Sequence, residues 1–154
     1  MQPLSDVERQ LMAHFGSRTA AFGFSPTLGK VGMAFLLADN PVSLGDLAAM
    51  VDDHARELLP ALTLMERLGL IARIDNVGDP EHLYTWRPEA WERLMAAGID
   101  AAAEVRFHLN AAKPQLTPDR PQVRHRVDEA LRFLQLYERE WQAVRARWTM
   151  GEAA

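Results

Sequence analysis

A single apolar stripe runs along the C-terminal part of this 154-residue chain. Over residues 122–148, apolar residues recur at steps of three, four and seven, the spacing that lines one side of an α-helix. One helix has too little of its own chain to bury such a stripe, and a stripe left in water is unusual for a monomer. We therefore expect a long helix that packs against the same stripe of a twofold-related copy. The stripe consists of Val123, Val127, Ala130, Leu134, Tyr137, Trp141, Val144 and Trp148.

Helix-start signals predict four helices in the N-terminal half. Ser5, with a glutamate three residues later, forms a capping box that begins a helix ending near residue 21. Ser25 followed by Pro26 begins a second helix, which ends near residue 38 before a proline. Ser43 caps a short third helix over residues 44–50. A fourth runs from about residue 54 to residue 68, where Gly69 ends it.

Pro60 falls inside the fourth expected helix. A proline in a helix interior costs about 3 kcal/mol, because it removes a backbone hydrogen bond and its ring clashes with the preceding turn. We therefore expect this helix to begin near Pro60 or to kink there.

Two short strands and two long helices complete the expected order. The pattern predicts two strands, at residues 70–74 and 82–86, which are joined by a turn at residues 76–80. Pro88 begins a long helix to about residue 112, which Lys113-Pro114 ends, and residues 115–121 are a linker. This order predicts a mostly α fold, a winged helix-turn-helix with N- and C-terminal dimerisation helices. We divide it into an N-terminal dimerisation helix (1–24), the winged helix-turn-helix (25–87) and a helical dimerisation arm (88–154).

The composition excludes several classes of protein. The chain has no cysteine, which rules out disulfides, thiol catalysis and cysteine-ligated metals. The N-terminus lacks the pattern of a signal peptide, and the longest apolar run is far shorter than the roughly 20 residues that span a bilayer. The histidines lack metal-ligand spacing, apart from Glu104 and His108 on one helical turn. No phosphate loop or catalytic triad stands out. We expect a cytoplasmic protein without membrane contact that is not an enzyme and uses no metal or cofactor.

The net charge of −4 lies wholly in the middle of the chain. Residues 25–87 hold nine acidic residues against five basic ones, whereas the segments before and after are each balanced. Affinity for duplex DNA depends largely on the neutralisation of phosphates by lysine and arginine. The acidic excess therefore disfavours tight DNA binding by the winged helix-turn-helix.

The stretch GFSPTLGKVGMAFLLADNPVSLGDLA, residues 23–48, resembles the GbsR branch of the MarR-type transcriptional regulators. The same pattern continues in MERLGLIARI and in Gly78 and Tyr84 of the wing, so the resemblance covers about residues 15–91. Lys30 stands where the family has an arginine, and the proline at Pro26 lies one place late. The resemblance implies a homodimeric regulator that binds double-stranded DNA and is sometimes tuned by a small ligand. The matching positions are Gly23, Gly29, Asp39, Pro41, Ser43, Leu44, Leu47 and Ala48.

The departures from the family lie in the elements that contact DNA. The family's recognition helix carries a run of hydroxyl and amide side chains, which form hydrogen bonds with phosphates and base edges. This chain has HARELLPA at residues 54–61 in that place. After the wing glycine the family has a basic stretch, whereas this chain has DPEH at residues 79–82. Because both elements have changed, we expect DNA binding to be weakened.

Five side chains form the candidate DNA-contact set: Lys30, Arg56, Thr63, Arg67 and Arg73. Arg56, Thr63 and Arg67 share one helical face with Pro60, and Lys30 and Arg73 are expected to join it around bound phosphates. The alternative is an ordinary solvated face on which Arg67 pairs with a nearby acid. A second basic cluster, from Arg120 to Arg132, has two interpretations. One is contact with backbone phosphates or an acidic partner; the other, which the interleaved acids favour, is an ordinary charged surface.

Four aromatic residues form a speculative ligand cage: Trp86, Trp91, Tyr137 and Trp141. Rings arranged around a quaternary ammonium group would bind it by cation–π attraction, and the family resemblance makes this ligand class worth naming. The alternative is that these rings pack in the dimer core and the wing.

Two functions remain open from the sequence. The first is a GbsR/MarR-like dimeric transcriptional regulator whose DNA binding is weakened. The alternative is a winged-helix dimer that does not bind DNA and acts through protein partners or a small ligand. In that case, a partner or the chain itself covers a face formed by Leu58, Leu59 and Pro60.

Overall fold

The computed structural model describes residues 4–75, 82–116 and 119–151. The chain divides into two compact units, Met1–Ala90 and Trp91–Ala154. We call the first unit the head and the second the arm. No helix in the described ranges is long and apolar enough to cross a membrane.

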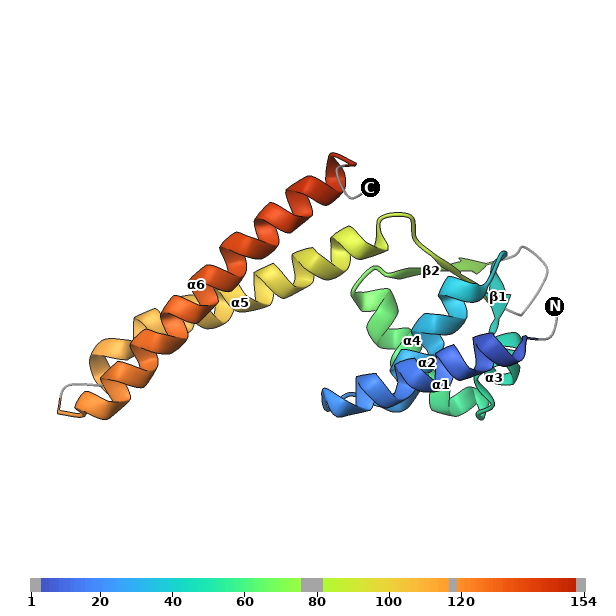
Figure 1. Cartoon of the computed structure of the whole chain (residues 1–154), viewed down its shortest axis with the longest axis horizontal. Coiled ribbons are helices and arrows are strands. Elements are labelled where there is room, and N and C mark those ends of the chain that lie inside the picture. The colour runs from blue at the N-terminus through green and yellow to red at the C-terminus, as the bar shows by residue number, and fades with distance from the viewer. Residues whose placement is uncertain (1–3, 76–81, 117–118, 152–154) are drawn as a thin grey trace. The chain divides into compact units, whose positions relative to one another are not determined.

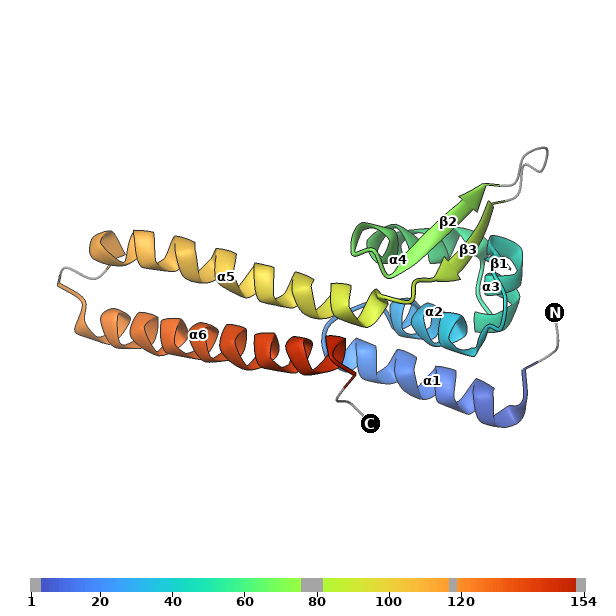
Figure 2. The same cartoon turned by 90° about the horizontal axis from the view of Figure 1, so that it is seen from above.

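The head contains four helices and three short strands, and the arm is formed by two long helices (Figures 1 and 2). The order of elements is the predicted one, with one additional strand. The head elements are α1 (Asp6–Ala21), α2 (Pro26–Leu37), β1 (Val42–Ser43), α3 (Leu44–Val51), α4 (Ala55–Arg67), β2 (Ile71–Asp75) and β3 (His82–Trp86). The arm helices are α5 (Ala90–Leu116) and α6 (Pro121–Thr149).

The predicted serine caps begin the first three helices. The Ser5 hydroxyl accepts a bond from the Glu8 backbone N–H at 3.3 Å, and the Glu8 carboxylate accepts one from the Ser5 N–H at 2.6 Å. The Ser5 hydroxyl also donates to the Glu8 carboxylate at 2.7 Å. This bond and the one from the Ser5 N–H lower the pKa of Glu8, because they stabilise its charged form. Ser25 caps α2 through the Thr27 N–H, and Ser43 caps α3 through the Asp46 N–H. The capping box and both single caps are therefore confirmed.

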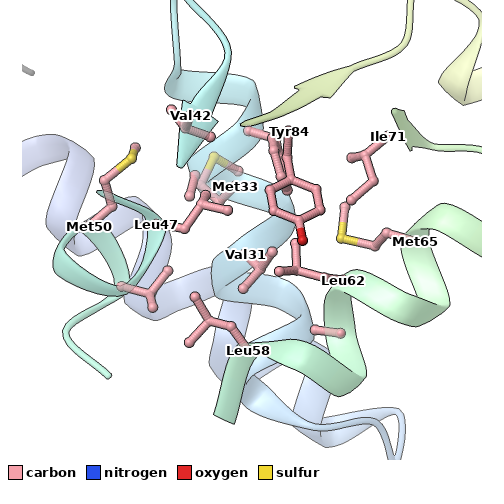
Figure 3. Packing of buried hydrophobic residues seen from close by; sticks show 14 of the residues in the cluster. Val31, Met33, Val42, Leu47, Met50, Leu58, Leu62, Met65, Ile71 and Tyr84 are labelled. Carbon is pink, nitrogen blue, oxygen red and sulfur yellow. The ribbon is translucent and has the colours of Figure 1, made fainter. Parts of the chain in front are cut away.

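The core of the head is built around α2. Its residues Val31, Met33, Ala34 and Phe35 are buried, and the helix contacts α1, α3, α4 and β3. Figure 3 shows side chains from α2, α3, α4 and the sheet converging in one cluster. The largest side chains that are fully removed from water are Leu47, Leu58, Leu62, Ile71 and Val31.

The sheet is antiparallel with strand order β1-β3-β2. β3 lies in the middle, with Tyr84 opposite both Val42 of β1 and Arg73 of β2. The predicted strands at residues 70–74 and 82–86 are confirmed within one residue. β1 was not expected, because two residues are too few for an alternating pattern. It forms because Val42 and Ser43 pair with the free edge of β3.

Both prolines that were expected to disturb helices lie inside the bounds of one. Pro60 is exposed in α4, which begins five residues earlier and continues to Arg67, so the expectation that the helix begins near Pro60 is wrong. α5 passes through Pro114 and ends two residues later, so the expected end at Lys113-Pro114 is also wrong. Pro114 lies in the last turn, where a missing N–H removes a single bond from the ladder.

In the arm, α5 and α6 form an antiparallel hairpin, and ion pairs between described residues of the two helices hold it together. Arg106 donates to both oxygens of Glu138, at 2.6 and 2.9 Å, and this bond lowers the pKa of that buried carboxyl. Arg145 pairs with Glu92 at 2.7 Å, and Lys113 pairs with Asp128. Part of the apolar stripe of α6 thus packs against α5 of the same chain. We had expected the whole stripe to pack against a second copy.

The crossing of α1 and α2 depends on Gly29. A Cβ atom at this position would lie 2.2 Å from the Thr19 hydroxyl and 2.6 Å from the Phe15 carbonyl oxygen, both on α1. We expect Gly29→Ala to lower the free energy of unfolding by about 2 kcal/mol, because the two backbones must move apart. Chemical denaturation followed by circular dichroism measures this change.

Gly32→Ala is the matched control on the same helix, because a Cβ there meets nothing within 4 Å. The control should raise stability by about 0.5–1 kcal/mol through helix propensity. Equal effects of the two substitutions would contradict the close packing at Gly29.

Candidate nucleic-acid interface

α4 presents one polar face to solvent. Leu58, Ala61, Leu62 and Met65 are buried in the core of the head, which fixes the rotation of the helix. The side chains predicted to share a face are all exposed: Arg56, Pro60, Thr63 and Arg67. In a winged helix-turn-helix this face is the one available to a DNA groove.

The two arginines of α4 differ in their partners. The Arg56 Nε lies 2.8 Å from the Glu57 carboxylate, and both side chains are exposed. Arg67 forms no ion pair with any residue that the structure describes, so the pairing expected in the alternative interpretation is not seen there. Arg67 is therefore the side chain of this face whose charge is least compensated by its neighbours.

Arg73 belongs to a cluster at the base of the wing. Its Nε lies 3.2 Å from the Asp75 carboxylate, and the same oxygen lies 2.8 Å from Nδ1 of His82 across the strand pair. Arg73 is exposed, but its charge is opposed by the carboxylate beside it. Nearby, burial and the charge of Glu66 raise the pKa of Tyr84, which remains a neutral hydrogen-bonding group.

Lys30 lies away from the α4 face. Its Nζ donates to the Val51 carbonyl at 3.3 Å, at the C-terminal end of α3, and its side chain packs over Gly16 of α1. α3 has no basic residue in its own last turn, so Lys30 supplies the positive charge that a helix C-terminus favours. The structure thus brings together Arg56, Thr63 and Arg67, places Arg73 on β2, and gives Lys30 a partner inside the head.

The turn between α3 and α4 carries two carboxylates that were not singled out from the sequence. Asp52 has a left-handed backbone conformation with φ 54°, and its N–H bonds the Ala48 carbonyl. Asp53 accepts a bond from the His54 N–H at 2.8 Å and faces the Thr27 hydroxyl at 3.5 Å. An Asp-Asp pair between two helices is a turn signal that also places negative charge beside the start of α4.

The face formed by Leu58, Leu59 and Pro60 is not a single surface. Leu58 is fully buried in the core, whereas Leu59 is 46% exposed and Pro60 is exposed beside it. The chain itself therefore covers Leu58, which is one of the two expected alternatives, whereas Leu59 and Pro60 remain exposed. The reason is that residues 58 and 59 lie about 100° apart around the helix.

The four residues of the speculative cage are distributed over both units. Trp86 packs against the core of the head, whereas Trp91, Tyr137 and Trp141 belong to the arm. The Tyr137 and Trp141 rings are neighbours along α6, with centroids 5.8 Å apart and planes at 45°. These two rings therefore form one continuous aromatic strip along α6.

Some predicted features lie outside the described residues. These are the wing tip at residues 76–81, with Gly78 and the acids Asp79 and Glu81. Within the described part of the chain, no three or more histidine or acidic side chains are grouped so that they could hold a metal ion.

Comparisons with known proteins show the fold. The chain is similar to a crystal structure of a transcriptional regulator, with a TM-score of 0.80 and 19% sequence identity, over 94% of this chain and 99% of that one. No protein-family model matches the chain, and no curated protein matches its sequence. The mostly helical architecture with a small three-stranded antiparallel sheet is therefore a winged-helix fold, shared with that structure.

Lys30 and Arg67 should differ in their effect on stability. Lys30→Met keeps the aliphatic stem but removes the bond to the Val51 carbonyl. We expect it to lower the free energy of unfolding by about 1 kcal/mol. Arg67→Met changes an exposed side chain and should stay within about 0.5 kcal/mol of the wild type. Urea unfolding of both variants tests whether the bond from Lys30 to the Val51 carbonyl stabilises the head. A Lys30→Met variant as stable as Arg67→Met would contradict that role.

Proposed function

We propose that this chain is a dimeric transcriptional regulator of the GbsR/MarR type that binds duplex DNA weakly in the cytoplasm. The observation that carries the proposal is the exposed polar face of α4, in a chain that shares its fold with a transcriptional regulator over nearly its whole length. The sequence resemblance over residues 15–91 supports the branch.

In this proposal α4 is the recognition helix and enters the major groove. Arg67 contacts a backbone phosphate, because its charge is not compensated in the head, and the Thr63 hydroxyl on the same face donates to a phosphate or a base edge. Arg56 contributes only after it leaves Glu57, and Arg73 only after it leaves Asp75. Asp52 and Asp53 stand beside this surface and repel phosphates, with roughly 1 kcal/mol at stake per close contact.

The arginines of α4 should therefore have unequal effects on DNA binding. We expect the protein to bind a pool of random 30-base-pair duplexes in low salt, measured by fluorescence anisotropy. Arg67→Ala should weaken binding about tenfold, because one uncompensated phosphate contact is lost. Glu57→Gln should strengthen binding a few-fold, because it releases Arg56.

Arg139→Ala is the control for a change of net charge. This arginine is exposed on α6, where it pairs with Glu140, and its loss should leave DNA affinity unchanged. Absence of binding to any duplex in low salt would remove the proposal. An Arg139→Ala variant as weak as Arg67→Ala would show that the effect is one of overall charge.

A second candidate function is a winged-helix dimer that no longer binds DNA and acts through a protein partner or a small ligand. The observation that favours it is Leu59, which stands 46% exposed on α4 beside Pro60 and Glu57. A leucine on this helix contributes at most a methyl contact to a thymine, whereas it suits an apolar pocket on a protein.

The second candidate predicts a partner that depends on Leu59. A protein captured from host cells by the wild type should be lost with Leu59→Lys and retained with Leu36→Lys. Leu36 is 41% exposed on α2, so the control matches both the residue type and its exposure. Retention of the partner by Leu59→Lys, measured by quantitative mass spectrometry, would count against this function.

A further inference from the structure

The outer face of α4 carries aliphatic carbon where a helix that reads bases is expected to carry hydrogen-bonding groups. Leu58 and Leu62 point into the core of the head, and their burial fixes which residues of the helix face outward (Figure 3). Leu59 is 46% exposed on the outer side, and Pro60 and Thr63 are exposed beside it.

These three exposed side chains form a continuous strip. At about 100° per residue, Thr63 lies about 40° from Leu59 and about 60° from Pro60 around the helix axis. Leu59 and Thr63 are also four residues apart, a spacing at which side chains on a helix are neighbours. Leucine and proline present carbon alone, and threonine presents its Cγ2 methyl group beside its hydroxyl. We call Leu59, Pro60 and Thr63 the aliphatic strip of α4.

An arginine stands at each end of the aliphatic strip. Arg56 precedes Leu59 by three residues and Arg67 follows Thr63 by four, so each lies about one turn beyond the strip. The two arginine positions are about 16 Å apart along the helix axis, and the major groove of duplex DNA is about 12 Å wide. With α4 in the groove, the arginines therefore reach the phosphates that border it while the strip faces the base edges.

The polar side chains of α4 offer few means of reading bases by hydrogen bonds. The helix contains no asparagine, glutamine or serine. The exposed carboxylate of Glu57 lies 2.8 Å from the Arg56 Nε, so these two groups satisfy each other. Most of what faces the bases is methyl and methylene carbon. In the major groove the bases themselves present one apolar group, which is the C5 methyl of thymine.

We propose that the aliphatic strip of α4 contacts the C5 methyl groups of thymines in the major groove and sets the sequence preference of this protein. The inference rests on the DNA binding proposed above and names the bases that are recognised. Leu59 makes the main contact, because it is the largest side chain of the strip, and the Thr63 methyl group adds to it. Because burial of a methyl group requires no charge, this contact is compatible with the carboxylates beside the surface.

Replacement of thymine by uracil tests the proposal, because uracil lacks only the C5 methyl group. The probe is a pool of random duplexes, prepared once with thymine and once with uracil at every thymine position. Loss of one buried methyl group changes a binding constant about fourfold. In low salt, the wild type should therefore bind the uracil pool at least about fourfold more weakly than the thymine pool, measured by fluorescence anisotropy.

Leu59→Ala should remove most of this discrimination. Its binding to the thymine pool should fall about fourfold, and the ratio of affinities for the two pools should drop below about twofold. Leu36→Ala is the matched control, because Leu36 is 41% exposed but lies on α2. This control should keep the ratio of the wild type. Circular dichroism verifies that both variants are folded.

Two substitutions of Thr63 separate the role of its methyl group from that of its hydroxyl. Thr63→Ser keeps the hydroxyl and removes the methyl group, so it should lower the ratio of affinities about twofold. Thr63→Val keeps a methyl group in the same place and removes the hydroxyl. It should weaken binding to both pools by the same factor and leave the ratio unchanged.

Two results would overturn the proposal and leave the DNA function in place. The first is equal binding of the thymine and uracil pools by the wild type. The second is a preference for thymine that persists in Leu59→Ala, which would assign the preference to the shape of the duplex. Absence of binding to either pool in low salt would remove the DNA function, and the recognition of thymine with it.

Discussion

The burial of α2 is the constraint on which the rest of the head depends. Val31, Ala34 and Phe35 are almost completely removed from water, and α1, α3, α4 and β3 all contact this helix. The approach of α1 requires the absence of a side chain at Gly29. Lys30, the next residue, bonds the end of α3. With α2 held in this way, Leu58 and Leu62 fix the rotation of α4, and Arg56, Thr63 and Arg67 must point outward.

Much of this arrangement follows from short-range chemistry that the sequence displays. The helix starts can be predicted from three N-cap serines, because their hydroxyls accept bonds from the first free N–H groups of each helix. These are Ser5, Ser25 and Ser43. Long-range packing explains what could not be predicted. β1 exists only because β3 offers an unpaired edge. The bond from Lys30 to Val51 could not be predicted, because nothing local shows that the end of α3 lies within reach of Lys30. Pro60 lies inside α4 because burial of Leu58, Ala61 and Leu62 outweighs one missing backbone bond.

The candidate DNA surface has an exposed polar helix face, but carboxylates lie beside several of its arginines. One face of α4 is exposed, yet Arg56 and Arg73 each lie against a carboxylate of their own chain. Asp52 and Asp53 add negative charge at the preceding turn. Of the two arginines on the α4 face, Arg67 is the one without an ion pair to a described residue. Site residues of this kind are only partly visible in a sequence, because the partner of each charge is decided by the fold.

The dependence of DNA affinity on salt tests this account most directly, because its slope reports how many phosphates the protein neutralises. With one uncompensated arginine on each α4, a dimer should release about two counterions, which gives a slope of log affinity against log salt near −2. A slope of about −6 or steeper would mean that most of the arginines named above contact phosphates. That result would contradict the claim that pairing within the chain has weakened DNA binding.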